Sequence, residues 1–383
     1  MFTTLYFLFS IALSLCYIYV LSKYHKAWKA IPTWEIPANF QPGTRVSVLI
    51  PARNELGNIV PCLESIFGQS YPKDLIEIIV LDDHSKDGTA EVVEKLQHPQ
   101  VRLLRLANFV EAGETQSFKK KAIETGIAQA GGELIVTTDA DCLMQSQWLE
   151  LLVSFYKKKR LKFIVAPVNF FKEKNLWERF QSLDFLGMMG TTGAGIQLRW
   201  MNMCNGANLA YAKSAFWEVG GFENIDRLAS GDDFLLMQKI AEKLPNQIGF
   251  LKNKAATVFT KAKPTFASFL SQRIRWASKS TSYKDWRMTF TLAMVFLFCG
   301  NIVLSFALIP FWGWAAFVLF LGQLLVKSAM DNFFLSEMAR FFKRAELMRS
   351  FVPAQLLHIA YIVVVGILGN VIKRYPWKGR WVR

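Results

Sequence analysis

Two aspartates stand one residue apart at the end of an apolar run. Residues 131–142 read GGELIVTTDADC, so Asp139 and Asp141 follow a strand-like stretch. Strand side chains alternate with period two, and an extended backbone would bring both carboxylates into one small volume. Carboxylates this close repel each other unless one is protonated or a cation compensates. A hard divalent ion such as Mg²⁺ or Mn²⁺ takes oxygen ligands and keeps positions for phosphate oxygens. A solvated turn, in which aspartate is also favoured, is the alternative.

Polar clusters also follow other apolar runs of the chain. Strand-like runs alternate with helical spacing, the former over 45–52, 75–83, 101–107 and 133–141, the latter over 54–69, 85–97 and 119–130. This order predicts an α/β fold whose mainly parallel sheet carries helices on both faces. Ligands of such sheets lie beyond the carboxyl ends of the strands. Three expected strands end in PARNE, LDDHS and TDADC, so three polar clusters are expected to meet at one rim.

No glycine-rich phosphate loop follows the first expected strand. The sequence has neither a Walker loop nor a Gly-x-Gly-x-x-Gly motif at that point. This argues against a P-loop kinase and against a dinucleotide oxidoreductase. Phosphates at the rim would instead be held by a metal ion and by cationic side chains.

The first 22 residues form an expected transmembrane helix. Residues 1–22 carry no charge and are long enough to span hydrocarbon. A signal peptide is the rival interpretation, but it would need a basic start and a small-residue cleavage site. Lys23, Lys26 and Lys29 begin an interfacial linker, 23–44, and the positive-inside rule places the chain after residue 23 in the cytoplasm. We therefore expect a multi-pass protein of the inner or plasma membrane with a cytoplasmic catalytic domain.

The C-terminal region, 289–372, is expected to hold two to three spans. Apolar segments cover 288–310, 311–326 and 352–372, and the basic stretch 327–350 is expected in the cytoplasm. The tail, 373–383, is basic and rich in tryptophan, which suits the cytoplasmic interface. Three C-terminal spans that start from the cytoplasm would place this tail on the opposite side of the membrane. One segment is therefore re-entrant or interfacial, and the sequence does not decide which.

The composition of the chain favours some classes of binding partner over others. The chain has a net charge of +15 and is 52% hydrophobic. Its charges gather beside the expected spans, which favours an anionic membrane surface and phosphate-bearing substrates over nucleic acid. The five cysteines lack the spacing of a metal site and are expected to be reduced thiols.

The motifs in this order resemble family 2 glycosyltransferases of the GT-A fold, the group that includes cellulose and hyaluronan synthases. The resemblance covers residues 45–280, with an interfacial end around 264–288. LIPARNE resembles the first-strand motif, with Pro51, Asn54 and Glu55 at its donor-binding positions. LDDHSKDGT resembles the second-strand motif, in which Asp82 and Asp83 would contact the base and ribose of a nucleotide sugar.

The resemblance also assigns the lysine and the carboxylates. In KKKAIETG, Lys119 holds the donor-contacting lysine position and Phe118 stands where glycine is usual, as does His84 in the preceding motif. TTDADC is the Asp-x-Asp motif, in which Asp141 would be the main metal ligand and Asp139 would support the metal or the ribose.

SGDDFLLMQKI resembles the segment that supplies the catalytic carboxylates Asp232 and Asp233. Asp233 would be the general base that takes the proton of an acceptor hydroxyl. The alternative is a helix N-terminus that uses aspartate as a cap, and both can hold together.

Two further motifs resemble acceptor-side elements of the family. Cys204, Asn205 and Gly206 lie in a segment placed near the acceptor. In QRIRW, Arg275 would pair with the donor diphosphate, and Gln272 and Trp276 would contact the acceptor. A membrane-interface helix, where arginine and tryptophan are both common, is the alternative for QRIRW.

The resemblance implies a membrane-bound, metal-dependent, inverting glycosyltransferase. The donor is a nucleoside-diphosphate sugar, most often a UDP-sugar, and the acceptor is a lipid or a growing glycan at the membrane. Transfer to a lipid is favoured because few spans are available to form a channel. A processive synthase that extrudes a polysaccharide and an inactive membrane scaffold that binds nucleotide sugars are the alternatives.

Overall fold

The computed structural model describes residues 2–110, 117–200, 203–226, 231–278, 285–372, 375–377 and 380–382. Contacts divide the chain into two compact units. The sheet unit comprises 32–171, 203–261 and 374–383, and the helical unit comprises 1–31, 172–202 and 262–373. Segments 172–202 and 262–278, which we expected within the catalytic domain, are thus grouped with the long apolar helices.

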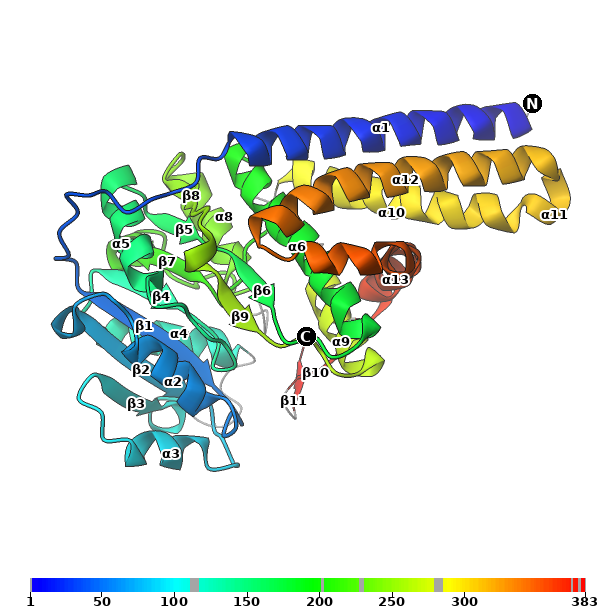
Figure 1. Ribbon diagram of the computed structural model, residues 1–383. Helices are drawn as coiled ribbons and strands as arrows, with labels where there is room; N and C mark the ends of the chain where they lie inside the picture. Colours follow the sequence, from blue (N-terminus) through cyan, green and yellow to red (C-terminus); the bar gives the residue numbers. More distant parts are fainter. Residues whose placement is uncertain are drawn as a thin grey trace. The chain divides into compact units, whose positions relative to one another are not determined.

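A sheet in the order β3-β2-β1-β4-β7-β5-β8 is the centre of the sheet unit (Figure 1). The strands are β1 (Val46–Ala52), β2 (Ile76–Asp82), β3 (Val101–Arg105), β4 (Leu134–Thr137), β5 (Phe163–Val165), β7 (Leu209–Ala212) and β8 (Ile248–Phe250). β1 pairs in parallel with β2 and β4, β2 with β3, and β5 with β8, while β7 runs antiparallel to β4 and β5. The predicted α/β fold with a mainly parallel sheet is confirmed.

Helices and a second, two-stranded sheet complete the sheet unit. The helices are α2 (Ile59–Phe67), α3 (Thr89–Lys95), α4 (Phe118–Gln129), α5 (Trp148–Lys159), α7 (Lys213–Glu218) and α8 (Phe234–Lys243), and short 3₁₀ turns are η1 (Lys73–Leu75), η2 (Leu106–Asn108) and η3 (Lys254–Ala256). The second sheet pairs β6 (Val168–Phe170) with β9 (Val258–Thr260). β1 and β4 are buried on both faces, which is why their sequences are continuous apolar runs rather than alternating ones.

The helical unit contains long apolar helices. Its elements are α1 (Phe2–Ala30), α6 (Leu176–Gln197), α9 (Phe266–Ala277), α10 (Trp286–Ala307), α11 (Ile309–Trp312), α12 (Trp314–Phe341), η5 (Ala345–Ser350) and α13 (Phe351–Val371). In the described residues, four helices are long and apolar enough to cross a membrane: Thr3–Ala30, Trp286–Ala307, Trp314–Phe341 and Ala345–Val371. The described parts of the tail form β10 (Tyr375–Trp377) and β11 (Arg380–Val382).

α1, α10 and α12 lie alongside one another (Figure 1). Near the start of α1, Tyr6 bonds with Ser305 at 2.9 Å, close to the end of α10. Near the end of α1, the Trp28 ring lies 5.2 Å from that of Phe341, the last residue of α12. α1 and α12 therefore run in one direction and α10 runs in the other, as in an up-down-up bundle.

Lys327 differs from the sequence prediction. We expected it in a cytoplasmic stretch after a span, but α12 continues without a break to Phe341. Lys327 is fully buried, and its Nζ lies 2.5 Å from Oδ2 of Asp331 one turn later. Tyr17 of α1 and Gln355 of α13 donate to the same carboxylate, Gln355 over 2.8 Å. An unpaired charge in a buried helix would be strongly destabilising, and here Asp331 supplies the counter-charge to Lys327.

α13 does not continue this bundle. Tyr361, at its middle, donates to Asp184 of α6 over 2.6 Å, and its ring lies 5.6 Å from that of Phe269 of α9. Near its end, a Cβ on Gly369 would lie 2.6 Å from Cβ of Ala277, the last residue of α9. α13 thus packs along α6 and α9 and against α10.

The Lys327–Asp331 pair predicts an asymmetry between single and double variants. Lys327→Met leaves the buried carboxylate without its cation and is expected to lower the free energy of unfolding by about 3–5 kcal/mol. The double variant Lys327→Met/Asp331→Leu removes both charges and is expected to lose clearly less. Thermal unfolding in detergent measures both, with Arg340→Ala, which breaks an exposed pair, as the control that loses less than about 1 kcal/mol. A double variant at least as unstable as the single one would contradict this account.

Candidate active site

The loops after β1 and β2 are joined side by side. Ala52 and Asp82 are register partners in the two strands, and Asp83 N–H donates to the Ala52 carbonyl oxygen over 2.8 Å. Beyond the strands, Asn54 N–H donates to Oγ of Ser85 over 3.0 Å. Asn54 is in the left-handed region with φ 52°, and asparagine tolerates that conformation better than most residues. The polar ends of these strands therefore form one connected surface, as the parallel order predicts.

Asn54 and Glu55 use their polar groups within these loops. Oδ1 of Asn54 accepts from Lys86 N–H at 2.9 Å. Glu55 N–H donates to Oγ1 of Thr89 over 2.8 Å, and its carboxylate accepts from Nδ2 of Asn58 at 2.7 Å. Pro51 lies within β1. The geometry of these three residues fixes the shape of the rim, and their contact with a donor stays a prediction.

Asp82 and Asp83 differ in their surroundings, although both are nearly buried. Nη1 of Arg53 lies 2.7 Å from the Asp83 carbonyl oxygen and 3.6 Å from Oδ1 of its carboxylate. Nδ1 of His84 lies 3.0 Å from the same carboxylate oxygen. In contrast, Oδ1 of Asp82 is buried and has no hydrogen-bond partner among the described residues. An unpaired buried carboxylate oxygen is costly, so Asp82 fits a site that a hydrogen-bond donor of a ligand completes.

Arg53 is a site residue that the sequence analysis missed. Arg53 lies between the motif residues Pro51 and Asn54 and is not itself a motif position, so only its position in space reveals a role. Its side chain is 11% exposed and donates to the Asp83 carbonyl oxygen, which ties the residue after β1 to the residue after β2. The feature that identifies Arg53 is its burial directly after β1, because arginine is rarely buried unless it is paired.

Lys119 connects two of the predicted carboxylates. Its Nζ lies 2.9 Å from Oδ1 of Asp139 and 3.2 Å from Oδ2 of Asp232. Burial alone would lower the pKa of this ammonium group, but the carboxylates of Asp139 and Asp232 raise the pKa above its ordinary value. Lys119 therefore stays charged and balances carboxylates from segments more than 90 residues apart in the chain.

Gly206 lies close to Lys119 and to the carboxylates of Asp232 and Asp233. Its N–H donates to Oδ2 of Asp233 over 3.2 Å, and its carbonyl accepts from Oγ1 of Thr137 at the end of β4 over 3.1 Å. A Cβ at position 206 would lie 3.3 Å from Oδ2 of Asp232 and 3.5 Å from Nζ of Lys119. Beside it, Oδ1 of Asn205 accepts from Ala207 N–H at 3.0 Å. The structure thus brings Lys119, Asp139, Asp232, Asp233 and Gly206 into one cluster, which we call the acidic cluster.

Asp233 is also a helix cap. Oδ1 accepts from Phe234 N–H at 2.8 Å, so Asp233 is the N-cap of α8. The capping interpretation is confirmed. Each carboxylate oxygen has two lone pairs, so one hydrogen bond at each leaves capacity for a proton from a ligand. The role of Asp233 as a base stays a prediction.

Two buried thiols flank the Asp-x-Asp segment. Sγ of Cys142 lies 3.7 Å from Oδ1 of Asp141, and Sγ of Cys62 lies 3.8 Å from the Asp139 carbonyl oxygen. Burial first, and then the charges of Asp141 and Asp139, raise the pKa of both thiols, which keeps them neutral. All five cysteines, each within the described residues, are free, as predicted.

The Asp-x-Asp segment fits a divalent ion that a substrate helps to hold. Asp139 and Asp141 supply hard oxygen donors, and the Asp139 side chain is 39% exposed. Among the described residues, no three or more histidine, cysteine or acidic side chains are arranged to hold a metal by themselves. Mg²⁺ is usually bound through one or two carboxylates plus substrate phosphates, and the donor set present here suits that mode.

Gln272, Arg275 and Trp276 are on α9 in the helical unit, whereas the acidic cluster is in the sheet unit. All three are half-buried, and the α9 stretch has the mixed apolar and basic character that was also expected of an interface helix. Oε1 of Gln272 is buried without a partner among the described residues. Their contacts with donor and acceptor stay predictions.

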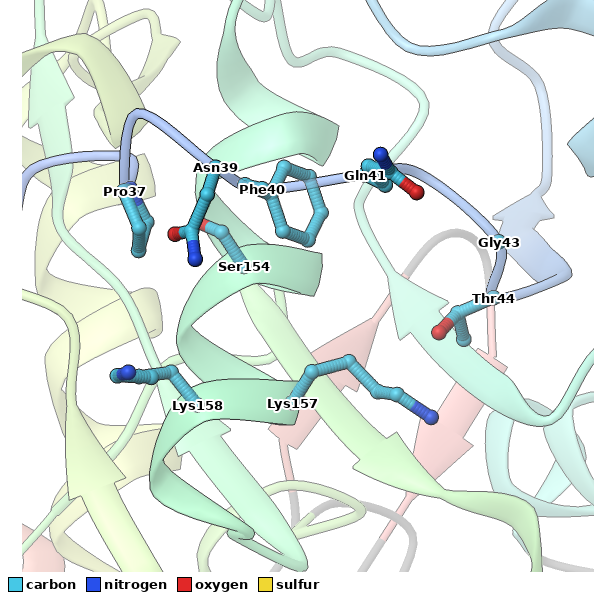
Figure 2. A pocket seen from close by; sticks show the side chains of 9 residues that line it. All are labelled: Pro37, Asn39, Phe40, Gln41, Gly43, Thr44, Ser154, Lys157 and Lys158. Carbon is cyan, nitrogen blue, oxygen red and sulfur yellow. The ribbon is translucent and has the colours of Figure 1, made fainter.

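A separate pocket lies between residues 37–44 and α5. Figure 2 shows Phe40 from the chain segment and Lys157 and Lys158 from the helix among its lining side chains. Its volume is about 440 Å³. None of the predicted site residues lines it, so this pocket is distinct from the acidic cluster.

Comparisons with known proteins agree on a family. The model of glycosyl transferase family 2 matches residues 47–220. The model of glycosyl transferase family group 2 matches residues 134–335, more than half of the chain.

Relatives include proteins named for different acceptors. Glycosyltransferase AglE of Haloferax volcanii is 30% identical over 190 residues, 49% of this chain and 58% of that protein. The poly-beta-1,6-N-acetyl-D-glucosamine synthase of Staphylococcus epidermidis is 23% identical over 61% of this chain and 53% of its own. The beta-monoglucosyldiacylglycerol synthase of Synechocystis is 25% identical over 67% and 52%. The chain spans about half the length of these curated relatives.

A solved structure shares the fold over nearly the whole chain. The mannosyltransferase PcManGT of Pyrobaculum calidifontis, in complex with GDP-Man and Mn²⁺, has a TM-score of 0.55 and 20% identity, covering 94% of this chain and 95% of that one. At this identity the likeness supports the fold.

The Lys119 contact predicts how charge in the acidic cluster controls metal binding. Lys119→Met removes the ammonium group that occupies Oδ1 of Asp139 and is expected to tighten binding of Mn²⁺ to the nucleotide-free protein about three- to tenfold, roughly 1 kcal/mol. Titration calorimetry with MnCl₂ measures this change. Lys121→Met, which removes an exposed lysine of the same helix, is the matched control and is expected to bind Mn²⁺ as the wild type does. Equal affinity in all three proteins would exclude Asp139 from the metal site.

Proposed function

The chain belongs to glycosyl transferase family 2, and from that premise we propose that it is a membrane-bound inverting glycosyltransferase. It takes a sugar from a nucleoside-diphosphate sugar, with a UDP-sugar as the first candidate, and transfers it to a lipid at the membrane. The observation that carries the proposal is the acidic cluster, in which carboxylates from distant segments meet around Lys119 at the end of β4.

The donor is bound at the rim of the sheet. Asp82 and Asp83 hold the nucleoside, and the unpaired oxygen of Asp82 accepts a hydrogen bond from the base or ribose. Asp141 and Asp139 hold a divalent ion, which when bound neutralises the charge that develops on the leaving nucleoside diphosphate. Lys119 and Arg275 add positive charge toward the phosphates, since a guanidinium can bind phosphate oxygens in a bidentate way.

Asp233 acts on the acceptor. Its carboxylate takes the proton of the acceptor hydroxyl while that oxygen bonds to the anomeric carbon of the sugar. The bond between this carbon and the diphosphate oxygen breaks in the same displacement, so the anomeric configuration inverts. Asp232 stands beside it in the chain, with its Oδ2 3.2 Å from Nζ of Lys119. Cys204, Asn205, Gly206, Gln272 and Trp276 shape the acceptor side.

The proposed membrane arrangement uses the long helices of the helical unit. α1, α10 and α12 are the spans, and α13 lies in the plane of the interface. Arg344, after α12, pairs with Glu173 before α6 at 2.7 Å, and the middle and end of α13 pack on α6 and α9. Near its start, Gln355 donates to Asp331 of α12, so the proposed placement of α13 rests on the middle and end of the helix.

Three spans favour a lipid acceptor. A channel for a polymer needs a wall of helices, and three spans offer little of one within a single copy of this chain. The processive alternative predicts a ladder of products, whereas transfer to a lipid adds a single sugar. An inactive scaffold is disfavoured because the carboxylates are present and assembled around a cation.

Asp233→Asn is expected to lower the rate of sugar transfer about 10²- to 10⁴-fold, because the amide cannot accept the acceptor proton. Donor binding should remain within twofold (about 0.4 kcal/mol), since Asp233 does not contact the nucleotide in this account. Single-turnover transfer to dioleoylglycerol in micelles and calorimetric UDP binding separate the two effects. Glu242→Gln, at an exposed carboxylate of the same helix, is the control. Unchanged transfer by Asp233→Asn would exclude it as the base.

The proposed topology predicts the side of the C-terminal tail. An epitope placed after Arg383 should be protected from protease in intact cells and cleaved in inverted vesicles, as should an epitope in the sheet unit. An epitope inserted at Gly313, between α11 and α12, should show the opposite behaviour. Cleavage of the C-terminal epitope in intact cells would make α13 a fourth span.

A further inference from the structure

One face of Trp276 is covered by a buried arginine. The guanidinium carbon of Arg273 lies 4.5 Å from the centre of the Trp276 ring and 4.8 Å from that of Phe269. The guanidinium is thus stacked within one helix, α9, between two rings. A cation placed over an indole face is attracted to it, most strongly where water is excluded. Arg273 is 4% exposed, so the stack is dry.

Arg273 is itself held from another helix. Its Nη2 lies 2.5 Å from Oδ2 of Asp184 in α6, and both side chains are 4% exposed. The other oxygen of Asp184 accepts from the Tyr361 hydroxyl of α13 at 2.6 Å. Nε2 of His358, also in α13, lies 3.8 Å from that oxygen. The carboxylate therefore ties three helices together and fixes the plane of the guanidinium.

We propose that Asp184 and Arg273 are positioning residues for acceptor binding, acting through Trp276. The ion pair orients the guanidinium, the guanidinium covers one face of the indole, and the half-buried remainder of the ring is presented to the sugar or lipid headgroup. This inference rests on the proposed function, because it takes Trp276 as the acceptor contact.

A purely structural role explains the pair less well. A buried ion pair is often no more stabilising than apolar side chains of similar size, so stability alone gives little reason for an arginine here. Two polar atoms of α9 also lack a hydrogen-bond partner among the described residues. They are the buried Nε of Arg273 and the buried Oε1 of Gln272. Buried hydrogen-bonding atoms without partners are uncommon, and they fit a site that a hydroxylated ligand completes.

A double-variant cycle on acceptor kinetics tests the coupling. With UDP-glucose as donor and dioleoylglycerol in micelles as acceptor, Asp184→Asn is expected to raise the acceptor KM about tenfold with the donor KM within twofold, the acceptor shift corresponding to about 1.4 kcal/mol. Trp276→Leu should raise the acceptor KM as well. In the Trp276→Leu background, Asp184→Asn should add less than twofold, because the residue through which it acts is gone. Additive effects would overturn the inference and leave the proposed function intact.

A second readout does not need activity. In protein labelled with 5-fluorotryptophan, the ¹⁹F signal of Trp276 is identified by its loss in Trp276→Phe. Asp184→Asn and Arg273→Lys should shift or broaden this signal, because a released guanidinium frees the indole. Asp331→Asn, at the other buried carboxylate of the helical unit, is the matched control and should leave the signal unchanged. An unmoved Trp276 signal in Asp184→Asn overturns the inference even where no sugar transfer is detected, whereas a shifted signal without transfer supports it and counts against the proposed reaction.

Discussion

Carboxylates that converge in one place must be neutralised, and the acidic cluster is built on that constraint. Asp139 follows β4, while Asp232 and Asp233 precede α8, so folding brings like charges together. Lys119 lies between two of them and offsets the repulsion, with its charged state favoured by both neighbours. The lysine therefore lets the carboxylates stay close together without a ligand, and a divalent ion can supply further positive charge when it binds.

The same rule holds for charges in other parts of the described chain. Arg53 is bound to Asp83, Lys327 to Asp331, and Arg273 to Asp184. Each pair joins residues whose isolated burial would cost several kcal/mol. Two of the three stand beside predicted site residues: Arg53 beside Asp83 and Arg273 beside Trp276. Buried arginine thus serves in both units to fix a group whose orientation matters.

The sequence predicted the parts of the fold that local pattern determines. β1, β2 and β4 were expected because buried parallel strands are continuous apolar runs, and their polar ends pointed to the rim. β5, β7 and β8 were not expected, since strands of three or four residues gain their pairing from tertiary contacts that no short window contains. Arg53 and Arg273 were missed for a related reason: each occupies a variable position inside a motif, and only its partner in space gives it a role. Lys327 was misplaced because hydropathy counts a charge without its counter-ion.

Composition alone does not distinguish whether α13 crosses the bilayer or lies at its surface. An apolar helix of this length has the same hydropathy whether it crosses the bilayer or lies along packed helices at its surface. In the structure, Gln355, His358 and Tyr361 of α13 follow one another at intervals of three residues, and all face polar partners of neighbouring helices. A helix with one polar seam and an otherwise apolar surface can join α6 and α9 while its remaining faces meet lipid.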